Sequence, residues 1–188
     1  MSLKHAILGF LTYRPFTGYD LKKFFDESVR HFWSAPQSQI YRTLKRLEEE
    51  KWVWMEMVEQ EDRPDRKVYH ITDEGRAELH RWLTTPLDLA RIRHKWLVQV
   101  FFAHQLPDEE IIALFEARAQ KLRQKLELFR TSVQAVVERR FAEERSERAR
   151  RLWQFTLDYG IAHIEWELQW IESALEELHH LPSDEQQS

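Results

Sequence analysis

Residues 108–159 contain neither glycine nor proline, and this stretch restricts the fold more than any other feature of the sequence. Apolar residues recur in it at intervals of three and four: Ile111, Phe115, Ala119, Leu122, Leu126, Phe129, Val133 and Val136. That spacing places them on one face of a helix. We therefore predict a long amphipathic helix from Pro107 or Asp108 to about residues 143–148. Only four Gly and six Pro argue against a turn-rich all-β protein, so the chain is expected to be mostly α-helical.

A second long helix, at about residues 146–179, carries two apolar stripes. The aliphatic stripe consists of Leu157, Ile161, Ile164, Leu168, Ile171, Leu175 and Leu178. The aromatic stripe consists of Tyr159, His163, Trp166 and Trp170. One stripe can be covered within the subunit, but the second needs another partner, which a two-fold homodimer supplies. We assign the dimer contact to the first six residues of the aliphatic stripe, although the pattern leaves open which stripe serves.

The aromatic stripe also has a second interpretation. With Trp96, its four side chains can form a pocket for a flat aromatic effector, although such a stripe is more often core or interface. His163 has no other ligand at a suitable spacing, so no metal site is predicted. The segment 91–104, which contains Trp96, is apolar on most sides and is expected to be a buried helix.

The first part of the chain has shorter elements. Its pattern predicts helices at 3–12, 18–28 and 36–50, strands at 51–60 and 67–71, and a last helix at 72–83. This order is that of a winged helix-turn-helix domain. Pro86 marks the join to the second part. We therefore expect a winged helix-turn-helix DNA-binding domain at 1–85, a helical dimerisation domain at 86–180 and a flexible tail at 181–188.

The third helix of this domain has a polar face that its core does not use. Ile40, Leu44 and Leu47 share one side of the helix. The other side carries the residues Gln37, Ser38, Tyr41, Arg42 and Lys45. Hydroxyl, amide and guanidinium groups can contact base edges or phosphates. An ordinary solvated face is the alternative, and the exposed Tyr41 favours contact.

Two neighbouring segments offer further phosphate contacts. Arg63, Arg66 and Lys67 lie at the predicted tip of the strand pair, where acidic residues are interleaved with them. Tyr19 and Lys22 begin the second helix. In both segments a plain solvated, charged surface is the alternative explanation.

Composition excludes several classes of protein. The net charge is −4, and residues 1–84 contain as many basic as acidic residues, so binding to a polyanion must use a local patch. There is no cysteine for disulfides or thiolate metal sites, and no apolar run long enough for a membrane span. Neither a phosphate-binding glycine loop nor a catalytic constellation is present. We expect a cytoplasmic protein that is not an enzyme, uses no cofactor and binds no membrane.

Three segments together resemble one family. "AILGFLTYRPFTGYDLKKFF", "SQIYRTLKRLEEE" and "RKVYHITDEGRAELHRWL" are similar to the PadR-like bacterial transcriptional regulators. "RHKWLVQVFFAHQLPDEE" and the helices after it resemble the virulence-activator-type C-terminal region. The resemblance covers nearly the whole chain and implies a dimeric winged-helix DNA binder, often a repressor. The sequence departs from the family at Lys51, where the family usually turns with Gly.

The resemblance also implies roles for individual residues. Tyr19 and Lys22 would contact the DNA backbone, and Arg66 and Lys67 would belong to the wing. The recognition-helix positions would be Ser38, Gln39, Tyr41, Arg42 and Lys45. The predicted function is a homodimeric, sequence-specific regulator of transcription that binds a palindromic operator in double-stranded DNA, with a small aromatic effector relieving repression. The alternative is a winged-helix adaptor that binds another protein and no DNA.

Overall fold

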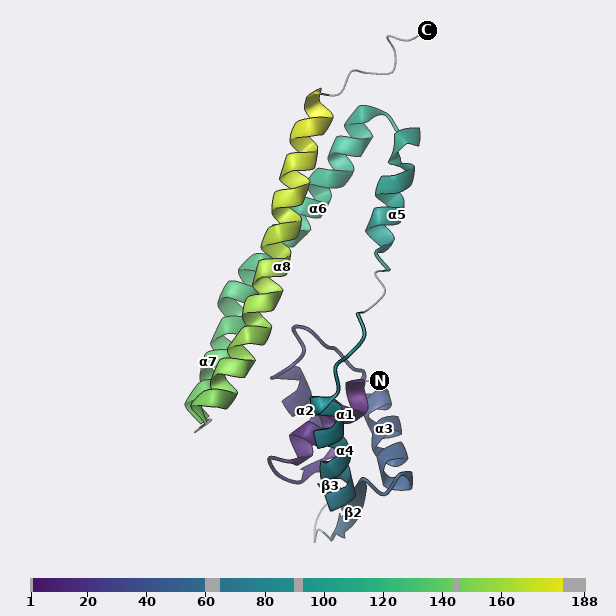
Figure 1. The fold of residues 1–188 in the computed structure, drawn as a ribbon, viewed down its shortest axis with the longest axis vertical. Helices are drawn as coiled ribbons and strands as arrows, with labels where there is room; N and C mark the ends of the chain where they lie inside the picture. Colours follow the sequence, from purple (N-terminus) through teal and green to yellow (C-terminus); the bar gives the residue numbers. More distant parts are fainter. Residues whose placement is uncertain (1, 60–64, 90–92, 144–145, 181–188) are drawn as a thin grey trace. The chain divides into compact units, whose positions relative to one another are not determined.

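The computed structural model describes residues 2–59, 65–89, 93–143 and 146–180 of the chain. The chain divides into two compact units, Met1–Leu89 and Ala90–Ser188. We call them the winged-helix unit and the helical unit and describe each by itself (Figure 1). None of the helices in the described ranges is both long and apolar enough to cross a membrane.

The winged-helix unit contains the predicted elements in the predicted order, and a winged-helix fold is confirmed. Its elements are α1 (Ser2–Leu11), β1 (Phe16–Thr17), α2 (Gly18–Asp26), α3 (Gln37–Glu49), β2 (Val53–Val58), β3 (Arg66–Ile71) and α4 (Asp73–Thr84). The strand β1 was not predicted. It extends the hairpin to a three-stranded antiparallel sheet in the order β1-β3-β2, with Phe16 opposite Tyr69.

One apolar core holds this unit together. Its fully covered side chains come from α1, α2 and α3: Ile7, Leu8, Leu21, Phe25, Ile40, Leu44 and Leu47. Burying a side chain of this size contributes about 2 kcal/mol. Because three of the seven belong to α3, the core fixes which side of that helix faces outward.

The structure shows how the chain turns after α3 with Lys51, where the family usually has glycine. Lys51 has a φ of 59°, the left-handed conformation that glycine adopts without strain. The amide of Trp52 donates to the carbonyl of Leu47 (2.9 Å), and the amide of Lys51 donates to that of Glu48 (3.0 Å). These two bonds make a Schellman motif, the usual end of a helix before glycine. The chain therefore makes the glycine-type turn with a lysine.

The helical unit is built from two long antiparallel segments and a short helix. Its elements are α5 (Lys95–Phe102), η1 (Ala103–Gln105), α6 (Asp108–Leu128), the π-helical turn η2 (Phe129–Val133), α7 (Gln134–Glu143) and α8 (Glu147–His180). Figure 1 shows α6 and α7 following one another along α8. The core between them includes Phe115, Leu122, Leu157, Ile164 and Ile171.

The π-helical turn shifts the apolar face of the long helix by one residue. The sequence pattern predicts Val136 as the next inward residue after Val133, but the structure buries Val137 and leaves Val136 half-buried. A π-turn accommodates one extra residue, so the positions that follow it are displaced by one. At the same place, a Cβ added to Gly160 of α8 would lie 2.6 Å from the ring of Phe129. The two helices therefore approach closely here because residue 160 is glycine.

The helix α5 differs from the expectation of a buried helix. Among its residues only Trp96 is buried, whereas Leu97, Val98, Phe101 and Phe102 are exposed. The reason is that a short helix at the edge of the unit has only one side covered by α6 and α8. Its other apolar side chains remain on the surface of the single chain.

Candidate nucleic-acid interface

The polar face of α3 lies open on the surface of the winged-helix unit. The predicted contact residues on this helix are all exposed: Gln37, Ser38, Gln39, Tyr41, Arg42 and Lys45. Tyr41 is 42% exposed, so neither it nor Arg42 is covered by the protein's own packing. The helix begins after Pro36, whose side chain makes no capping hydrogen bond. Backbone amides in the first turn of a helix favour anions such as phosphate.

Tyr41 is positioned by the first residue of α2. A Cβ added to Gly18 would lie 2.3 Å from the Cε1 atom of Tyr41, so the phenol ring packs directly on the glycine. Thr17 caps α2 by accepting a hydrogen bond from the amide of Asp20 (3.1 Å), and its hydroxyl donates to the Asp20 carboxylate (2.8 Å). The start of α2 is therefore rigidly built, and it sets the orientation of Tyr41 on α3.

A buried tyrosine lies close to this contact. Tyr69 of β3 is 7% exposed. Burial, followed by the negative charge of Glu48, raises the pKa of Tyr69 above its ordinary value. Its phenol is therefore neutral at physiological pH. The polar and charged groups that this region offers to a partner are the exposed side chains of α3.

The residues predicted on α2 and the wing are only partly free. Tyr19 and Lys67 are exposed. Lys22 forms an ion pair with Asp26, and Arg66 forms one with Asp20 (3.0 Å). Arg63 lies outside the described residues. Lys22 and Arg66 therefore have carboxylate partners within the single chain, and their contact to DNA stays a prediction.

Asp20 is the residue that sequence reasoning missed. It caps α2 through Thr17 and holds Arg66 of β3, 46 residues away. The signal in the sequence was weak, because a Thr followed three residues later by an acid only indicates a helix start. Its link to the wing depends on the tertiary fold.

The aliphatic stripe on α8 packs inside the helical unit of the single chain, and its assignment to the dimer contact stays a prediction for the half-buried Ile161 and Leu175. Its buried members are Leu157, Ile164, Leu168 and Ile171, and Ile161, Leu175 and Leu178 pack against the same cluster. The partner of the stripe is the long segment α6 to α7 of the same chain. A second subunit therefore cannot reach the buried members of the stripe in this fold.

The aromatic stripe stays on the surface and is not one pocket. Tyr159, His163 and Trp166 form an exposed ladder, with ring centroids 6.3 and 6.2 Å apart. Trp96 is buried and contacts Trp170 edge-on at 5.7 Å. The five residues predicted to form an effector pocket therefore separate into a contact between the buried Trp96 and the exposed Trp170, and an outward-facing ladder of the other three.

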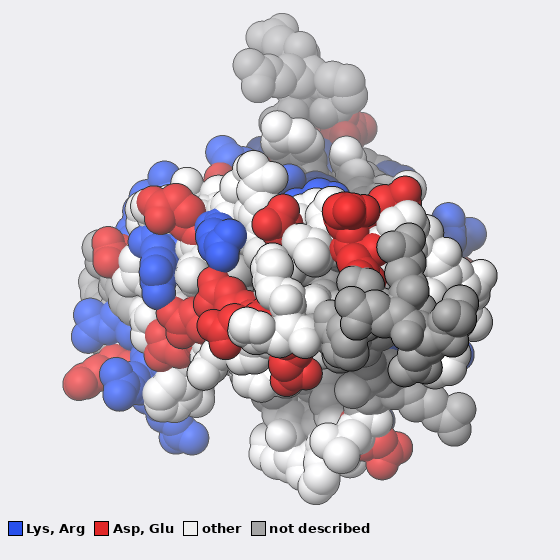
Figure 2. Space-filling view, turned by 90° about the horizontal axis from the view of Figure 1, so that it is seen from above, with Lys and Arg blue, Asp and Glu red and all other residues white. Residues whose placement is uncertain are grey.

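Charge on one face of the molecule is mixed in sign. The face drawn in Figure 2 shows acidic and basic side chains next to one another. Among the described residues, no group of three or more His, Cys, Asp and Glu is arranged to hold a metal ion. The net charge of the chain is −4, so recognition of a polyanion depends on a local patch of basic side chains and not on the overall charge.

Comparison with known proteins places the chain in a family. The model of the "Transcriptional regulator PadR-like family" matches residues 7–81, and the model "Virulence activator alpha C-term" matches residues 92–179. The negative transcriptional regulator PadR of Bacillus subtilis is 35% identical over 125 residues, which are 66% of this chain and 69% of that protein. The chain belongs to the PadR-like family of transcriptional regulators. PadR-like proteins are regulators and not enzymes.

The chain is also similar to one other curated regulator and to two solved structures of Bacillus subtilis PadR. A probable transcriptional regulator of Mycobacterium tuberculosis is 50% identical over 91 residues, and this match spans about half of each protein, 48%. The crystal structure of Bacillus subtilis PadR in complex with operator DNA has a TM-score of 0.79 at 28% identity, covering 95% of this chain and 99% of that one. The complex of the same regulator with p-coumaric acid has a TM-score of 0.75, also at 28% identity, covering 95% and 96%.

Proposed function

We propose that this chain is a homodimeric repressor that binds operator DNA with α3. The observation that carries the proposal is the division of α3 into a buried apolar side, Ile40, Leu44 and Leu47, and an exposed polar side. The core does not use the polar side, which leaves it for an outside partner. The operator complex of Bacillus subtilis PadR, whose fold this chain shares, supports duplex DNA as that partner.

In this proposal, α3 lies in the major groove. Gln37, Ser38 and Gln39 belong to its first turn, the part of a recognition helix that contacts base edges. The guanidinium of Arg42 suits the two acceptors of guanine, and Lys45 suits a phosphate. Tyr41 adds contact area with an orientation set by Gly18.

Backbone contacts from α2 and the wing fix the register of α3. Tyr19 and Lys67 are exposed and suited to this role. Lys22 and Arg66 would exchange their carboxylate partners, Asp26 and Asp20, for phosphates. Such an exchange has a low cost, because ion pairs that are accessible to solvent contribute about 1 kcal/mol or less.

The dimer contact in this proposal is formed by the apolar surface that the helical unit leaves open. Trp166 and Tyr159 of α8 are 62% and 74% exposed, and Phe101 of α5 is 74% exposed. Large exposed aromatic residues of this kind are typical of interfaces between proteins. A two-fold dimer also supplies the two recognition helices that a palindromic operator requires.

A small aromatic effector completes the proposal. Bacillus subtilis PadR has been crystallised with p-coumaric acid, an aromatic carboxylic acid. For this chain we propose an effector of the same general type, a flat aromatic molecule, whose binding weakens the hold of α3 on DNA. A ligand changes such an equilibrium only by binding one of the two states more tightly.

The test is a gel-shift titration of the full chain on the DNA upstream of its own gene. We expect Arg42→Ala to weaken binding about tenfold or more, because a bidentate base contact contributes about 1–3 kcal/mol. Lys45→Ala should weaken binding to all sequences and lower the slope of affinity against salt by about one phosphate contact.

The matched control is Lys121→Ala. Lys121 is an exposed base on α6, outside the winged-helix unit, so its loss should leave the titration unchanged. If the double variant of Arg42 and Lys45 binds as tightly as the unaltered protein, the proposal is wrong and a protein-binding adaptor becomes the better hypothesis.

A further inference from the structure

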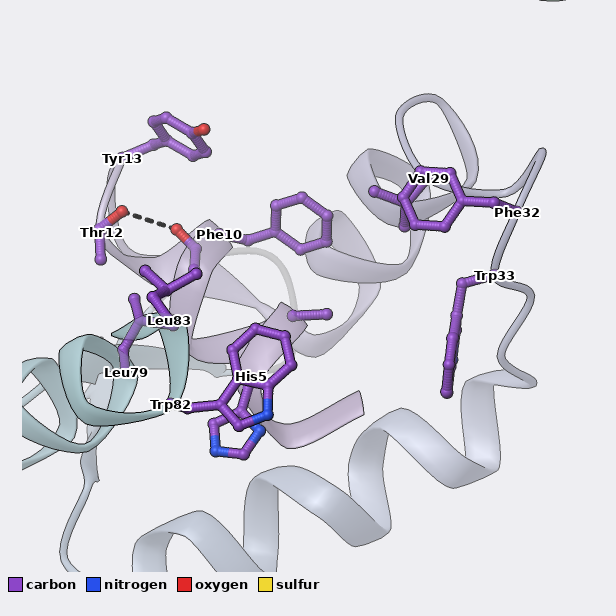
Figure 3. A pocket seen from close by; sticks show the side chains of 12 residues that line it. His5, Phe10, Thr12, Tyr13, Val29, Phe32, Trp33, Leu79, Trp82 and Leu83 are labelled. Atoms are coloured by element: carbon purple, nitrogen blue, oxygen red, sulfur yellow. Dashed lines mark hydrogen bonds between the residues drawn. The ribbon is translucent and has the colours of Figure 1, made fainter. Parts of the chain in front are cut away.

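The cavity beside α1 and α4 in the winged-helix unit offers no base to a phosphate. Its volume is about 370 Å³, and Figure 3 shows an apolar and aromatic wall, with Phe10, Trp33 and Trp82 close to His5. None of the described residues that line it is Lys or Arg. The bases that can contact a phosphate therefore lie elsewhere in the unit, and several of them are already paired with acids.

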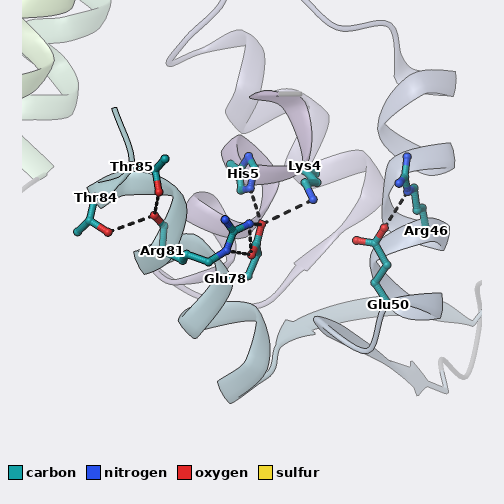
Figure 4. A network of polar contacts seen from close by, with 8 residues as sticks. All are labelled: Lys4, His5, Arg46, Glu50, Glu78, Arg81, Thr84 and Thr85. Carbon is teal, nitrogen blue, oxygen red and sulfur yellow. Dashed lines mark hydrogen bonds and ion pairs between the residues drawn. The ribbon is translucent and has the colours of Figure 1, made fainter. Parts of the chain in front are cut away.

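Most of these ion pairs have a structural explanation. Arg46 and Glu50 lie four residues apart on α3, with Nε and Oε1 2.8 Å apart (Figure 4). Lys4 and Arg81 both pair with Glu78, which is 8% exposed (Figure 4). A pair at this spacing stabilises its helix, and a buried carboxylate requires a partner.

The pair of Arg66 and Asp20 has neither explanation. Arg66 begins β3 in the wing, whereas Asp20 lies in the first turn of α2, and the atoms Nη2 and Oδ2 are 3.0 Å apart. Both side chains are accessible, at 48% and 39%. An ion pair between two accessible side chains contributes little to stability. Its effect is therefore to be expected in what Arg66 can bind.

The carboxylate of Asp20 is held in place from its own side. The oxygen that accepts from Arg66 also accepts from the hydroxyl of Thr17 (2.8 Å). The Thr17 oxygen in turn accepts from the amide of Asp20 (3.1 Å). Thr17 also belongs to β1 and pairs with Val68, two residues after Arg66. The acid is thus fixed next to the start of β3, and Arg66 can pair with it without ordering a flexible partner.

A phosphate that approaches Arg66 has to compete with this carboxylate. A guanidinium group binds carboxylate and phosphate with the same donors, and the charge of Asp20 repels a phosphate at that place. Non-specific binding depends on phosphate contacts that form in many registers. In such complexes Arg66 stays with Asp20. When the base contacts of α3 fix one register, a phosphate is held beside the wing and the exchange takes place.

We propose that Asp20 is a specificity-determining residue, which withholds Arg66 from the phosphates of non-specific DNA. The proposal rests on the proposed function, because α3 has to supply the register. An acid that contacts no base itself then takes part in the choice of sequence. Loss of its charge strengthens binding to random DNA more than binding to the operator.

The test measures the salt dependence of binding by Asp20→Asn to two duplexes of equal length, the DNA upstream of the gene and a random sequence. Asparagine can still accept from the Thr17 hydroxyl, but it has no charge to hold Arg66. We expect random DNA to bind about fivefold more tightly, the upper value of an accessible ion pair. Its slope of log affinity against log salt should steepen by about 0.9, the value of one further phosphate contact. On the upstream DNA, where Arg66 already contacts a phosphate, the slope should stay the same.

Two further variants separate the pair from the effect of charge alone. In a double variant with Arg66→Ala, Asp20→Asn should no longer steepen the slope. Asp108→Asn removes an exposed carboxylate from the first turn of α6 and should leave the binding of both duplexes unchanged. A poorly folded variant would bind more weakly, so the expected gain cannot come from a loss of structure.

The proposal is overturned if Asp20→Asn binds random DNA no more tightly, if both duplexes gain equally, or if the steeper slope persists without Arg66. Failure of the DNA-binding proposal looks different, because the unaltered protein would then bind both duplexes alike.

Elution from heparin, a polyanion without bases, tests the exchange at Arg66 in either case. Asp20→Asn should elute at higher salt than the unaltered protein, and the double variant should elute with Arg66→Ala alone. An unchanged elution of Asp20→Asn would mean that Asp20 does not withhold Arg66, whatever DNA the chain binds.

Discussion

The longest helix of each unit's core, α3 in the winged-helix unit and α8 in the helical unit, exposes a different kind of side chain. In the winged-helix unit, α3 has one buried apolar side and one polar side, and the three apolar side chains that define it are fully covered. In the helical unit, α8 buries its aliphatic stripe and also exposes aromatic side chains such as Tyr159 and Trp166. The contrast lies between the two helices: α3 leaves a mainly polar side open, whereas α8 leaves aromatic side chains open, and exposed apolar residues such as Trp54 and Leu83 also occur elsewhere in the winged-helix unit.

The difference indicates two kinds of partner. A polar helix face can exchange its hydrogen bonds with water for hydrogen bonds to the edges of bases and to phosphates. An apolar helix face that stays exposed after folding is stabilised most by contact with another apolar face, because that contact removes both faces from water. The contrast therefore supports DNA as the partner of the winged-helix unit and a second copy of the chain as the partner of the helical unit.

The strongest test of this contrast replaces one buried and one exposed side chain. Leu44→Ala should lower the free energy of unfolding by about 4 kcal/mol, because a fully buried leucine leaves a cavity. Trp166→Ala should change the unfolding of the monomer little and weaken the dimer instead, by about 2 kcal/mol or roughly 30-fold. Urea unfolding and sedimentation equilibrium measure the two effects. A dimer that is unchanged in Trp166→Ala would argue against the aromatic surface as the contact.

The next test concerns the ion-pair network that joins α1 to α4. The hydrogen bond from His5, with those from Arg81 and the nearby charge of Lys4, holds the pKa of Glu78 below its ordinary value. A carboxyl group whose pKa is lowered by folding stabilises the protein above its unfolded pKa, and this contribution is lost as the pH falls through the folded pKa. Glu78→Gln should therefore lower the free energy of unfolding by about 2 kcal/mol at pH 7.

The pH dependence distinguishes this charge from simple packing. The difference in unfolding free energy between Glu78→Gln and the unaltered protein should shrink as the pH is lowered from 6 towards 3. The reason is that Glu78 of the unaltered protein becomes protonated and its charge no longer stabilises the fold. Urea unfolding at several pH values measures it. A loss that is the same at all pH values would mean that shape, and not charge, explains the role of Glu78.

A glycine pair compares the packing of the two units directly. Gly160→Ala brings a Cβ to 2.6 Å from the ring of Phe129, which is buried, so we expect a loss of about 1 kcal/mol after the gain in helix propensity. Gly9→Ala meets no atom within 4 Å and should gain up to about 1 kcal/mol. Thermal unfolding shows whether each of the two substitutions stabilises or destabilises the protein. Stabilisation by both substitutions would show that the helices of the helical unit are not in close contact at Gly160.

The smallest expected effect is at Lys51. Because its φ of 59° strains a residue with a side chain, Lys51→Gly should stabilise the winged-helix unit by about 0.5–1 kcal/mol. Lys45→Gly within α3, the helix that ends just before Lys51, is the control, and it should destabilise, since Lys45 has ordinary helical geometry. If Lys51→Gly destabilises the protein, the lysine side chain stabilises the fold by more than the strain of its positive φ destabilises it.

The sequence was sufficient for elements whose pattern is local. The helices follow the spacing of their apolar residues, and the outward side of α3 follows from Ile40, Leu44 and Leu47. The strand β1 has only two residues, Phe16 and Thr17, and therefore no period of its own. It exists because Phe16 pairs with Tyr69, which is distant in the sequence.

The functional surfaces were less predictable, because they depend on which segments meet. Both stripes of α8 are equally regular, and only the packing of α6 and α7 decides that the aliphatic stripe is the buried one. The pairing of Arg66 with Asp20 and the cavity beside His5 each combine residues from distant parts of the chain. No spacing rule within one helix reveals such combinations.

The π-helical turn Phe129–Val133 implies a rule for length differences among related chains. Each residue of an α-helix advances the side chains by 100°. A relative that lacks one residue in this turn would regain regular α-helical bonding, and the residue equivalent to Val137 would still face inward. A relative of the same length without the π-turn would instead turn the residue equivalent to Val136 inward, and the whole inward set of α7 would be exchanged for its neighbours.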